Sequence, residues 1–377
     1  MIEKNINKDE INKMYNDIAD ELNISDSVFE SANRSYHALG LYLSNNIKDY
    51  KVEIFPQGSM NLGTLIKPIS DKDDYDLDAV CKVNYDFESP GELKNLIGDT
   101  LKKSDMYSKL LDPEEGKRCW TLKYADNAQF HMDILPSVPN NDAKNKSIKI
   151  THKEGDLYKF ITSSPEDYAD WFKNLQEREY KILLEKYSAD VADLKKFNKR
   201  TTLQKTIQIL KRHRDVKYAN IPEVERENKP ISIIITTLVG KMYTGNETIL
   251  DLIEKFVCNY HNYITVNSKG CYVIENPINS EENFADKWNI YPERKDAFYK
   301  WIEELKYDLI TNNFMLFSDL VDKSKVLKKV FGENLVKSVF EKKTLSNNEK
   351  YIKNNDVATL ISEETNIPVK GHTFYGK

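Results

Sequence analysis

The spacing of hydrophobic residues changes twice along this chain. Near the start, apolar residues recur every three to four positions, which predicts helices over residues 8–22 and 26–46. From residue 52 to residue 135, apolar and polar residues alternate instead, as they do in half-buried strands. From about residue 165 onward the helical spacing returns. The pattern predicts a sheet-rich lobe followed by a helical lobe.

Two aspartates lie inside one of the predicted strands. The period of two places Asp76 and Asp78 on one strand face, and Leu77, Ala79 and Cys81 on the other. A charge that is buried without a partner destabilises a fold strongly. Two carboxylates within an apolar alternation therefore indicate a functional site rather than a solvated turn.

A second predicted strand carries a third aspartate. Between residues 130 and 135, apolar side chains alternate with His131 and Asp133, and Pro136 is expected to end the strand. Residues 118–124 are expected to form a hairpin with this strand. An ionised side chain on a strand with apolar neighbours again favours a functional role.

Pairing of the two aspartate strands would bring Asp76, Asp78 and Asp133 together on one face. Three carboxylates that close repel one another unless cations lie among them, and Mg²⁺ prefers a few carboxylates with phosphate oxygens and water. Two ions about 3.5–4 Å apart would stabilise the attacking and the leaving oxygen of a displacement. The carboxylates therefore predict a site of metal-dependent nucleotidyl transfer.

A glycine–serine pair precedes these carboxylates. Gly58 and Ser59 follow a predicted strand that begins at Val52, and they precede residues 60–64, which can form one helical turn. A glycine lets the backbone approach a phosphate closely, and the serine hydroxyl with nearby N–H groups can donate to its oxygens. Ser59 lies seventeen residues before Asp76, so one strand–loop–strand unit can bring a triphosphate and metals together.

The later part of the chain predicts helices with polar and apolar faces. Residues 202–215 show an apolar stripe beside a polar face. That face consists of Gln204, Gln208, Lys211 and Asp215. Ser232 is expected to be the N-cap of an apolar helix over residues 233–243, and a further helix is expected over residues 280–289.

These residues resemble the pattern of the nucleotidyltransferases related to cyclic GMP-AMP synthase and oligoadenylate synthase. Within them, the chain is similar to the bacterial CD-NTases, also called second-messenger oligonucleotide or dinucleotide synthetases. The family pattern is Gly-Ser, then Asp-x-Asp, then a third Asp on a later strand. It maps onto Gly58, Ser59, Asp76, Asp78 and Asp133. The resemblance extends to residues 56–64, 203–214, 230–232, 276–288 and 372–376.

The resemblance implies an α+β fold with two lobes and the active site in the cleft between them. One lobe is a polymerase-β-like nucleotidyltransferase sheet, and the other is helical, as in oligoadenylate synthase. The implied domains are a catalytic lobe with N-terminal helices (1–160), a helical nucleotide-binding lobe (161–342) and a C-terminal extension (343–377). The implied catalytic residues, which would hold two Mg²⁺ ions or Mn²⁺ in their place, are Asp76, Asp78 and Asp133. The implied nucleotide-binding residues are Gln57, Gly58, Ser59, Lys211 and Ser232.

The implied activity is the synthesis of a cyclic di- or trinucleotide second messenger from ribonucleoside triphosphates, in anti-phage CBASS signalling. The implied partners are ATP, GTP or pyrimidine triphosphates, with effector and regulator proteins from the same operon. Some relatives are conjugated through a C-terminal Gly or Ala, a pattern from which Lys377 departs. The alternatives are an RNA-tailing or protein-modifying nucleotidyltransferase and a catalytically silent nucleotide-binding protein.

Composition limits the classes of substrate and the cellular compartments to be expected. The formal net charge is −5, so no global basic field favours long nucleic acid as a substrate. The cysteines Cys81, Cys119, Cys258 and Cys271 are dispersed without a Cys-x-x-Cys pair, which suits a reducing cytoplasm. Cys258, His261 and Cys271 would lack a fourth zinc ligand, and Cys258 is expected in a helix core. No apolar run reaches the roughly 18–20 residues of a membrane span, and no signal peptide is evident, so a cytoplasmic protein is expected.

Overall fold

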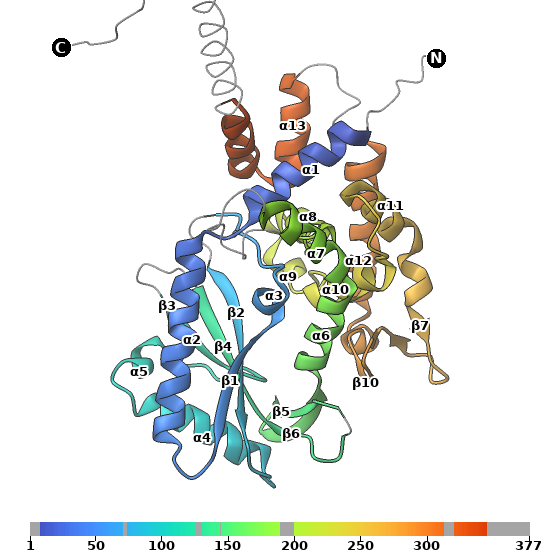
Figure 1. Ribbon diagram of the computed structural model, residues 1–377. Helices are drawn as coiled ribbons and strands as arrows, with labels where there is room; N and C mark the ends of the chain where they lie inside the picture. Colours follow the sequence, from blue (N-terminus) through green and yellow to red (C-terminus); the bar gives the residue numbers. More distant parts are fainter. Residues whose placement is uncertain are drawn as a thin grey trace, which may run out of the picture.

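A six-stranded sheet occupies one side of the molecule, and a larger group of helices occupies the other (Figure 1). The computed structural model describes residues 8–70, 74–124, 130–143, 145–188, 200–312 and 320–344. The sheet is formed mainly by the part of the chain that was predicted to be rich in strands. Most of the helices come from the segments before and after that part.

The strand order in the sheet is β1-β2-β4-β5-β6, and β3 pairs with the first half of β4. β2 and β4 run parallel, and the other neighbouring pairs are antiparallel. The six strands are β1 (Val52–Gln57), β2 (Tyr75–Val83), β3 (Trp120–Tyr124), β4 (Phe130–Pro139), β5 (Ile148–Glu154) and β6 (Leu157–Ser163). Two small hairpins are formed by β7 (Thr265–Val266) with β8 (Tyr272–Val273) and by β9 (Glu275–Asn276) with β10 (Asn279–Asn283).

Apart from the first one, the early helices pack on the sheet side, and the later ones form the helical lobe. The helices up to the end of the sheet are α1 (Lys8–Leu22), α2 (Asp26–Asn46), α3 (Gly58–Leu62), α4 (Pro90–Lys102) and α5 (Tyr107–Leu110). Those that follow are α6 (Pro165–Leu175), α7 (Glu177–Ser188), α8 (Thr202–Ala219), α9 (Glu223–Arg226), α10 (Ser232–Met242), α11 (Ile249–Asn259), α12 (Pro292–Lys306), α13 (Leu320–Phe331) and a helix over residues 333–344. Shorter turns are the 3₁₀ helices η2 (Tyr260–Tyr263) and η3 (Asp286–Asn289) and the π-helix η4 (Tyr307–Thr311).

The two faces of β2 serve different purposes. Leu77, Ala79 and Cys81 belong to the core that α2 and α4 form on one face of the sheet. Val80 belongs to a separate, smaller cluster on the opposite face. Asp76 and Asp78 alternate with the buried α2-facing residues, so they lie on the face that does not carry α2. The predicted alternation along this strand is confirmed.

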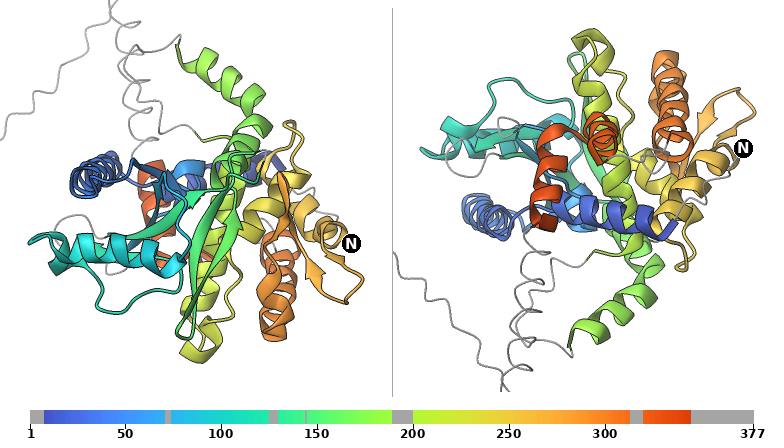
Figure 2. Two further views of the ribbon diagram at one scale, coloured as in Figure 1. Left: turned by 90° about the horizontal axis from the view of Figure 1, so that it is seen from below. Right: turned by 90° about the horizontal axis from the view of Figure 1, so that it is seen from above.

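α8 forms the centre of the helical lobe, where it packs against α1, α10, α11 and α13 (Figure 2). Although α1 precedes the sheet in the sequence, its apolar face joins the same core as that of α8. The residues involved include Ile11, Tyr15 and Ile18 of α1 with Ile207 and Leu210 of α8. No helix among the described residues is long and apolar enough to cross a lipid bilayer.

One expectation about the sheet is wrong. β4 does not end at Pro136 but continues to Pro139. On one side of β4, β3 pairs as far as Ile134, and β5 begins at Ser137. Pro136 therefore lies in the gap between these two partners, while β2 pairs through it on the other side, with Cys81 as its register partner.

Two expectations about the helical lobe are also wrong. Residues 280–289 form the end of the β9–β10 hairpin and the short η3 turn instead of a helix. The Asn283 side chain accepts hydrogen bonds from the N–H groups of Ile274 and Ala285, and such local side-chain bonds compete with helix formation. Cys258 is exposed, because the apolar stripe of α11 passes through Phe256 and Val257 and leaves the next position outward.

Candidate active site

The parallel pairing of β2 with β4 brings the three aspartates together. Asp78 is the register partner of Asp133, and Asp76 is the register partner of His131. Oxygens of Asp76, Asp78 and Asp133 lie within 4.8 Å of one another, so they could hold a metal ion. The juxtaposition expected from two separate strands of the sequence is therefore present.

The three carboxylates have different surroundings. Partial burial, together with the charges of Asp76 and Asp133, raises the pKa of Asp78 to about 7. A contact of 3.2 Å from the Nε2 atom of His131 to Oδ1 of Asp76 lowers the pKa of Asp76 and raises that of His131. Asp133 accepts a hydrogen bond of 2.5 Å from the Thr121 hydroxyl on β3. Asp78 thus carries most of the repulsion, which a bound cation would relieve.

Gly58 lies directly against this cluster. Its residue neighbour Gln57 is the register partner of Asp78, and Gly58 itself has a φ of +62°. A Cβ atom at Gly58 would lie 2.1 Å from Oδ2 of Asp78. The position therefore requires glycine both for its backbone conformation and for its space. The next residue, Ser59, accepts backbone hydrogen bonds from Thr64 and Leu65 through its carbonyl, which folds the loop after α3 back on itself.

The polar face of α8 holds this loop from the other side. Gln204 donates to the carbonyl of Leu62, Gln208 to that of Leu65, and Lys211 to that of Thr64 at 3.0 Å. This is the face that the sequence predicts, and its one basic residue is buried rather than solvated: Lys211 is 6% exposed. Burial and the neighbouring Arg214 lower the pKa of Lys211 to about 8.

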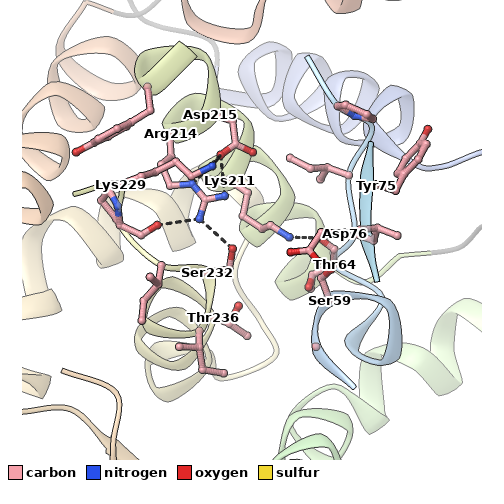
Figure 3. A pocket seen from close by; sticks show the side chains of 18 of the residues that line it. Ser59, Thr64, Tyr75, Asp76, Lys211, Arg214, Asp215, Lys229, Ser232 and Thr236 are labelled. Atoms are coloured by element: carbon pink, nitrogen blue, oxygen red, sulfur yellow. Dashed lines mark hydrogen bonds and ion pairs between the residues drawn. The ribbon is translucent and has the colours of Figure 1, made fainter. Parts of the chain in front are cut away.

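Ser232 lies at the start of α10, one residue further into the helix than expected. The N-cap is Ile231, and Ser232 is the first helical residue, so the predicted capping role is wrong. Its hydroxyl instead accepts a hydrogen bond of 2.9 Å from Arg214 on α8 (Figure 3). The carbonyl of Pro230, two residues earlier, also accepts from Arg214 at 2.9 Å.

A cavity of about 930 Å³ separates the sheet side of the site from the helical side. Its lining includes Ser59, Asp76 and Asp78 on one side and Lys211 and Ser232 on the other (Figure 3). A second cavity of about 660 Å³ also borders Gly58 and Leu62. Of the residues expected to bind nucleotide, Gln57 lines the second cavity, and Gly58 lines both.

Two residues at the site were not singled out in the sequence. His131 contacts Asp76, and the signal was present, because the alternation already places it on the face of Asp133. Arg214 bonds Ser232 and lies three residues after Lys211, close to the same helix face. Its neighbours Lys205 and Arg212 made it resemble part of an ordinary basic surface.

Comparison with known proteins gives concordant matches. The family model "Second Messenger Oligonucleotide or Dinucleotide Synthetase domain" matches residues 10–175. A c-di-GMP synthase of Roseivirga ehrenbergii is 28% identical over 361 residues, which cover 91% of each chain.

Solved structures show the same fold. The CD-NTase CdnG of Bradyrhizobium diazoefficiens in complex with GTP matches with a TM-score of 0.70 and 19% identity, over 89% of this chain and 99% of that one. CdnC of E. coli MS115-1 with ATP matches with a TM-score of 0.55 and 14% identity, over 86% of this chain and 97% of that one. The GTP-bound form of DncV from Vibrio cholerae matches with a TM-score of 0.53 and 16% identity, over 87% of this chain and 80% of that one. The expected α+β nucleotidyltransferase fold with two lobes is confirmed.

Proposed function

We propose that the chain is a bacterial CD-NTase, which joins ribonucleoside triphosphates into a cyclic di- or trinucleotide second messenger and releases pyrophosphate. A cyclic dinucleotide is the first candidate product, and c-di-GMP is the first to look for, because the curated relative bears that name. Signalling in anti-phage defence fits this family.

One observation carries the proposal. Asp76 and Asp78 on β2 face a buried lysine on α8 and a serine on α10 across one cavity, which Gly58 and Ser59 also line. Asp133 on β4 completes the carboxylate cluster behind them, within 4.8 Å of both. A nucleoside triphosphate needs both kinds of group, since its phosphates bind cations and hydrogen-bond donors while its reacting phosphorus needs metal ions. The arrangement supports phosphoryl chemistry at the carboxylate side of the cavity.

The carboxylates fit divalent cations. Burial, together with the charges of Asp76 and Asp133, raises the pKa of Asp78, and a cation beside it would favour its ionised form. We assign Asp76, Asp78 and Asp133 as catalytic residues that would hold two Mg²⁺ ions, or Mn²⁺ in their place. Such ions, when bound, would acidify the attacking ribose hydroxyl and neutralise charge on the triphosphate and on the pyrophosphate that leaves.

The chain's own groups would fix the donor nucleotide. We propose that the hydroxyls of Ser59 and Ser232 and the ammonium of Lys211 donate to its phosphate oxygens, and that the first N–H groups of α10 add to this attraction. Gly58, which lacks a side chain, lets the backbone approach the phosphates beside Asp78. These contacts would hold the α-phosphorus in line with the incoming hydroxyl.

The second cavity suits the nucleotide that supplies this hydroxyl. The first cavity is lined by four aspartates, two of them in the carboxylate cluster, and by the cations Lys67, Lys211, Arg214, Arg226 and Lys229. The second has Arg118 but also the acids Glu281, Glu282 and Asp286. A triphosphate donor therefore favours the first cavity. We place the acceptor in the second, where Gln57 lies beside the shared Gly58.

The decisive experiment is incubation of the purified protein with all four ribonucleoside triphosphates and Mg²⁺ or Mn²⁺, followed by phosphatase and mass spectrometry. Cyclic products survive phosphatase, so their masses would give the bases and the ring size together. The matched control is Asp76→Asn, which should fold normally and form no product. Product formation by this variant would contradict the assignment of the metal site.

The same assay tests the alternatives. Pyrophosphate release that requires added RNA would favour an RNA-tailing enzyme, and nucleotide binding without any product would favour a silent binding protein. The division into units 1–160, 161–342 and 343–377 remains part of the proposal, as do a cytoplasmic location and operon-encoded effector and regulator proteins. Residues 345–377, including the terminal Lys377 that bears on conjugation, lie outside the described residues.

A further inference from the structure

Arg214 is the most completely bonded cation at the first cavity, and no role in nucleotide transfer has yet been given to it. It is 4% exposed, although it is one of the residues that border this cavity. Its Nη1 atom donates to the Ser232 hydroxyl and to the Pro230 carbonyl, both at 2.9 Å. Its Nε and Nη2 atoms contact Oδ1 of Asp215 at 2.8 and 2.7 Å. The guanidinium therefore links α8 to the start of α10 and to Pro230 just before it (Figure 3).

The bond to Ser232 decides how that hydroxyl can be used. A serine hydroxyl has one proton to donate and two lone pairs that accept. Arg214 has protons only, so in this contact the Ser232 oxygen must be the acceptor. The single hydroxyl proton then stays available for a donor bond into the cavity, where a phosphate oxygen can accept it. Arg214 would thus set the direction in which Ser232 donates.

The charge of Arg214 is already matched inside the protein. Asp215 faces it, and Lys229 also approaches Oδ1 of Asp215 at 3.3 Å. Although burial opposes ionisation of Asp215, Arg214 and Lys229 hold its pKa below the usual range. A guanidinium that is held by a carboxylate, a carbonyl and a hydroxyl has little freedom to reorient toward a ligand. Lys211 differs, because the neighbour to which it donates is the neutral Thr64 carbonyl.

We propose that Arg214 is a positioning residue for the donor nucleotide, which acts through Ser232 by fixing its hydroxyl and the Pro230 backbone against α8. This inference rests on the proposed function and deepens it. It predicts that removing Arg214 costs affinity for a triphosphate only while Ser232 is present to be positioned.

A double-mutant cycle tests the proposal. The four proteins are wild type, Arg214→Met, Ser232→Ala and the double variant, and the probes are ATP and GTP with a methylene group between the α- and β-phosphates. Dissociation constants are measured by calorimetry with Mg²⁺, so the readout does not depend on catalysis. We expect each single variant to weaken binding about tenfold, or about 1.4 kcal/mol, and the double variant to be no weaker than the worse single variant.

Three outcomes would overturn the proposal. A double variant about a hundredfold weaker than wild type would mean that Arg214 and Ser232 act independently, and unchanged binding by either single variant would remove one end of the link. Arg214→Lys keeps the charge but cannot span Ser232, Pro230 and Asp215 together, so it should bind as weakly as Arg214→Met. Full binding by Arg214→Lys would show that charge alone suffices.

Two controls separate this inference from folding and from the proposed function. Thermal unfolding of each variant, measured without nucleotide, must remain cooperative, and the cycle is evaluated at a temperature well below every midpoint. Failure of the proposed function would appear as wild type that binds the methylene analogues but forms no cyclic product. Failure of the positioning role would leave product formation by wild type intact.

Discussion

The sheet side and the helical side of the first cavity are built on opposite electrostatic principles. On the sheet side, Asp78 lies near two other carboxylates, and burial together with their charges raises its pKa to about 7. On the helical side, Arg214 contacts Asp215, a carbonyl and a hydroxyl, and Lys211 donates to the carbonyl of Thr64. The charge of Arg214 is thus matched by a carboxylate, and Lys211 is hydrogen-bonded, before any ligand arrives.

This difference indicates what each side needs from a ligand. The sheet side is destabilised by repulsion among its own carboxylates. Cations that bind there would remove this repulsion and thereby stabilise the folded protein. The helical side is ordered by its own hydrogen bonds, so it can offer donors at fixed positions without reorganisation. The comparison therefore predicts that neutralising a carboxylate has opposite effects on stability on the two sides.

The largest expected effect comes from Asp78→Asn. This change should lower product formation by at least about a thousandfold, because it removes a metal ligand, and yet raise the melting temperature of the metal-free protein. Asp215→Asn is the matched control on the helical side. It should lower the melting temperature, because it leaves Arg214 and Lys229 without their carboxylate. Differential scanning calorimetry with EDTA measures both signs, and a decrease for Asp78→Asn would refute the comparison.

The same carboxylate predicts a pH dependence of stability. Because the pKa of folded Asp78 is raised from 3.8 to about 7, the folded state holds this proton more tightly than the unfolded state does. The contribution of Asp78 to the unfolding free energy should therefore fall between about pH 4 and pH 7 and level off above that. Urea titrations of wild type and Asp78→Asn without metal isolate this contribution, and saturating Mg²⁺ should reduce the fall.

A smaller but still large effect is expected from Gly58→Ala. The new Cβ atom would lie 2.1 Å from Oδ2 of Asp78, so the carboxylate must move away from its partners. Activity should fall about a hundredfold, since displacements of about 1 Å at a reacting centre have effects of that size. Gly155→Ala is the control, because Gly155 has nearly the same φ, +61°, with nothing within 4 Å of its Cβ position. Equal losses of activity in both variants would assign the effect to backbone strain alone.

The sequence predicted the sheet side better than the helical side, for a physical reason. On a strand the period of two assigns every side chain to a face, so Asp76, Asp78 and Asp133 could be placed once the strands were identified. The parallel pairing of β2 with β4 then brought them together. The continuation through Pro136 was missed, because it depends on where the partner strands β3 and β5 begin and end.

On the helical side, the sequence indicates faces but not partners. The polar face of α8 was predicted, yet whether Lys211 on that face meets water or the loop after α3 depends on tertiary packing. Ser232 was expected to cap α10, but its hydroxyl accepts a hydrogen bond from Arg214 of α8 instead. Likewise, hydrogen bonds that the Asn283 side chain accepts from Ile274 and Ala285 compete with the helix expected over residues 280–289. Long-range polar contacts of this kind leave no periodic trace in the sequence.

A moderate effect is expected from Lys211→Met, with a characteristic pH profile. Burial and Arg214 lower the pKa of Lys211 to about 8, so its charge is lost as the pH rises through that value. The affinity of wild type for a methylene triphosphate analogue should therefore weaken between about pH 7 and pH 9. In Lys211→Met the affinity should be about ten- to a hundredfold lower at pH 7 and nearly independent of pH over that interval. A parallel slope in the two proteins would show that another group titrates.

The smallest effect is expected from Lys205→Met. This variant tests whether the helical side binds triphosphate through cations at specific positions or through a general positive potential. Lys205 is a cation on the same helix as Lys211, but it pairs with Asp20 of α1 at 2.9 Å and donates to Asn16. Its loss should cost at most about 1 kcal/mol of stability and leave the affinity for the analogue within about twofold. If Lys205→Met weakened binding as much as Lys211→Met, and salt removed both losses, a general positive potential would explain the helical side. Position along one helix would then matter less than the sum of its charges.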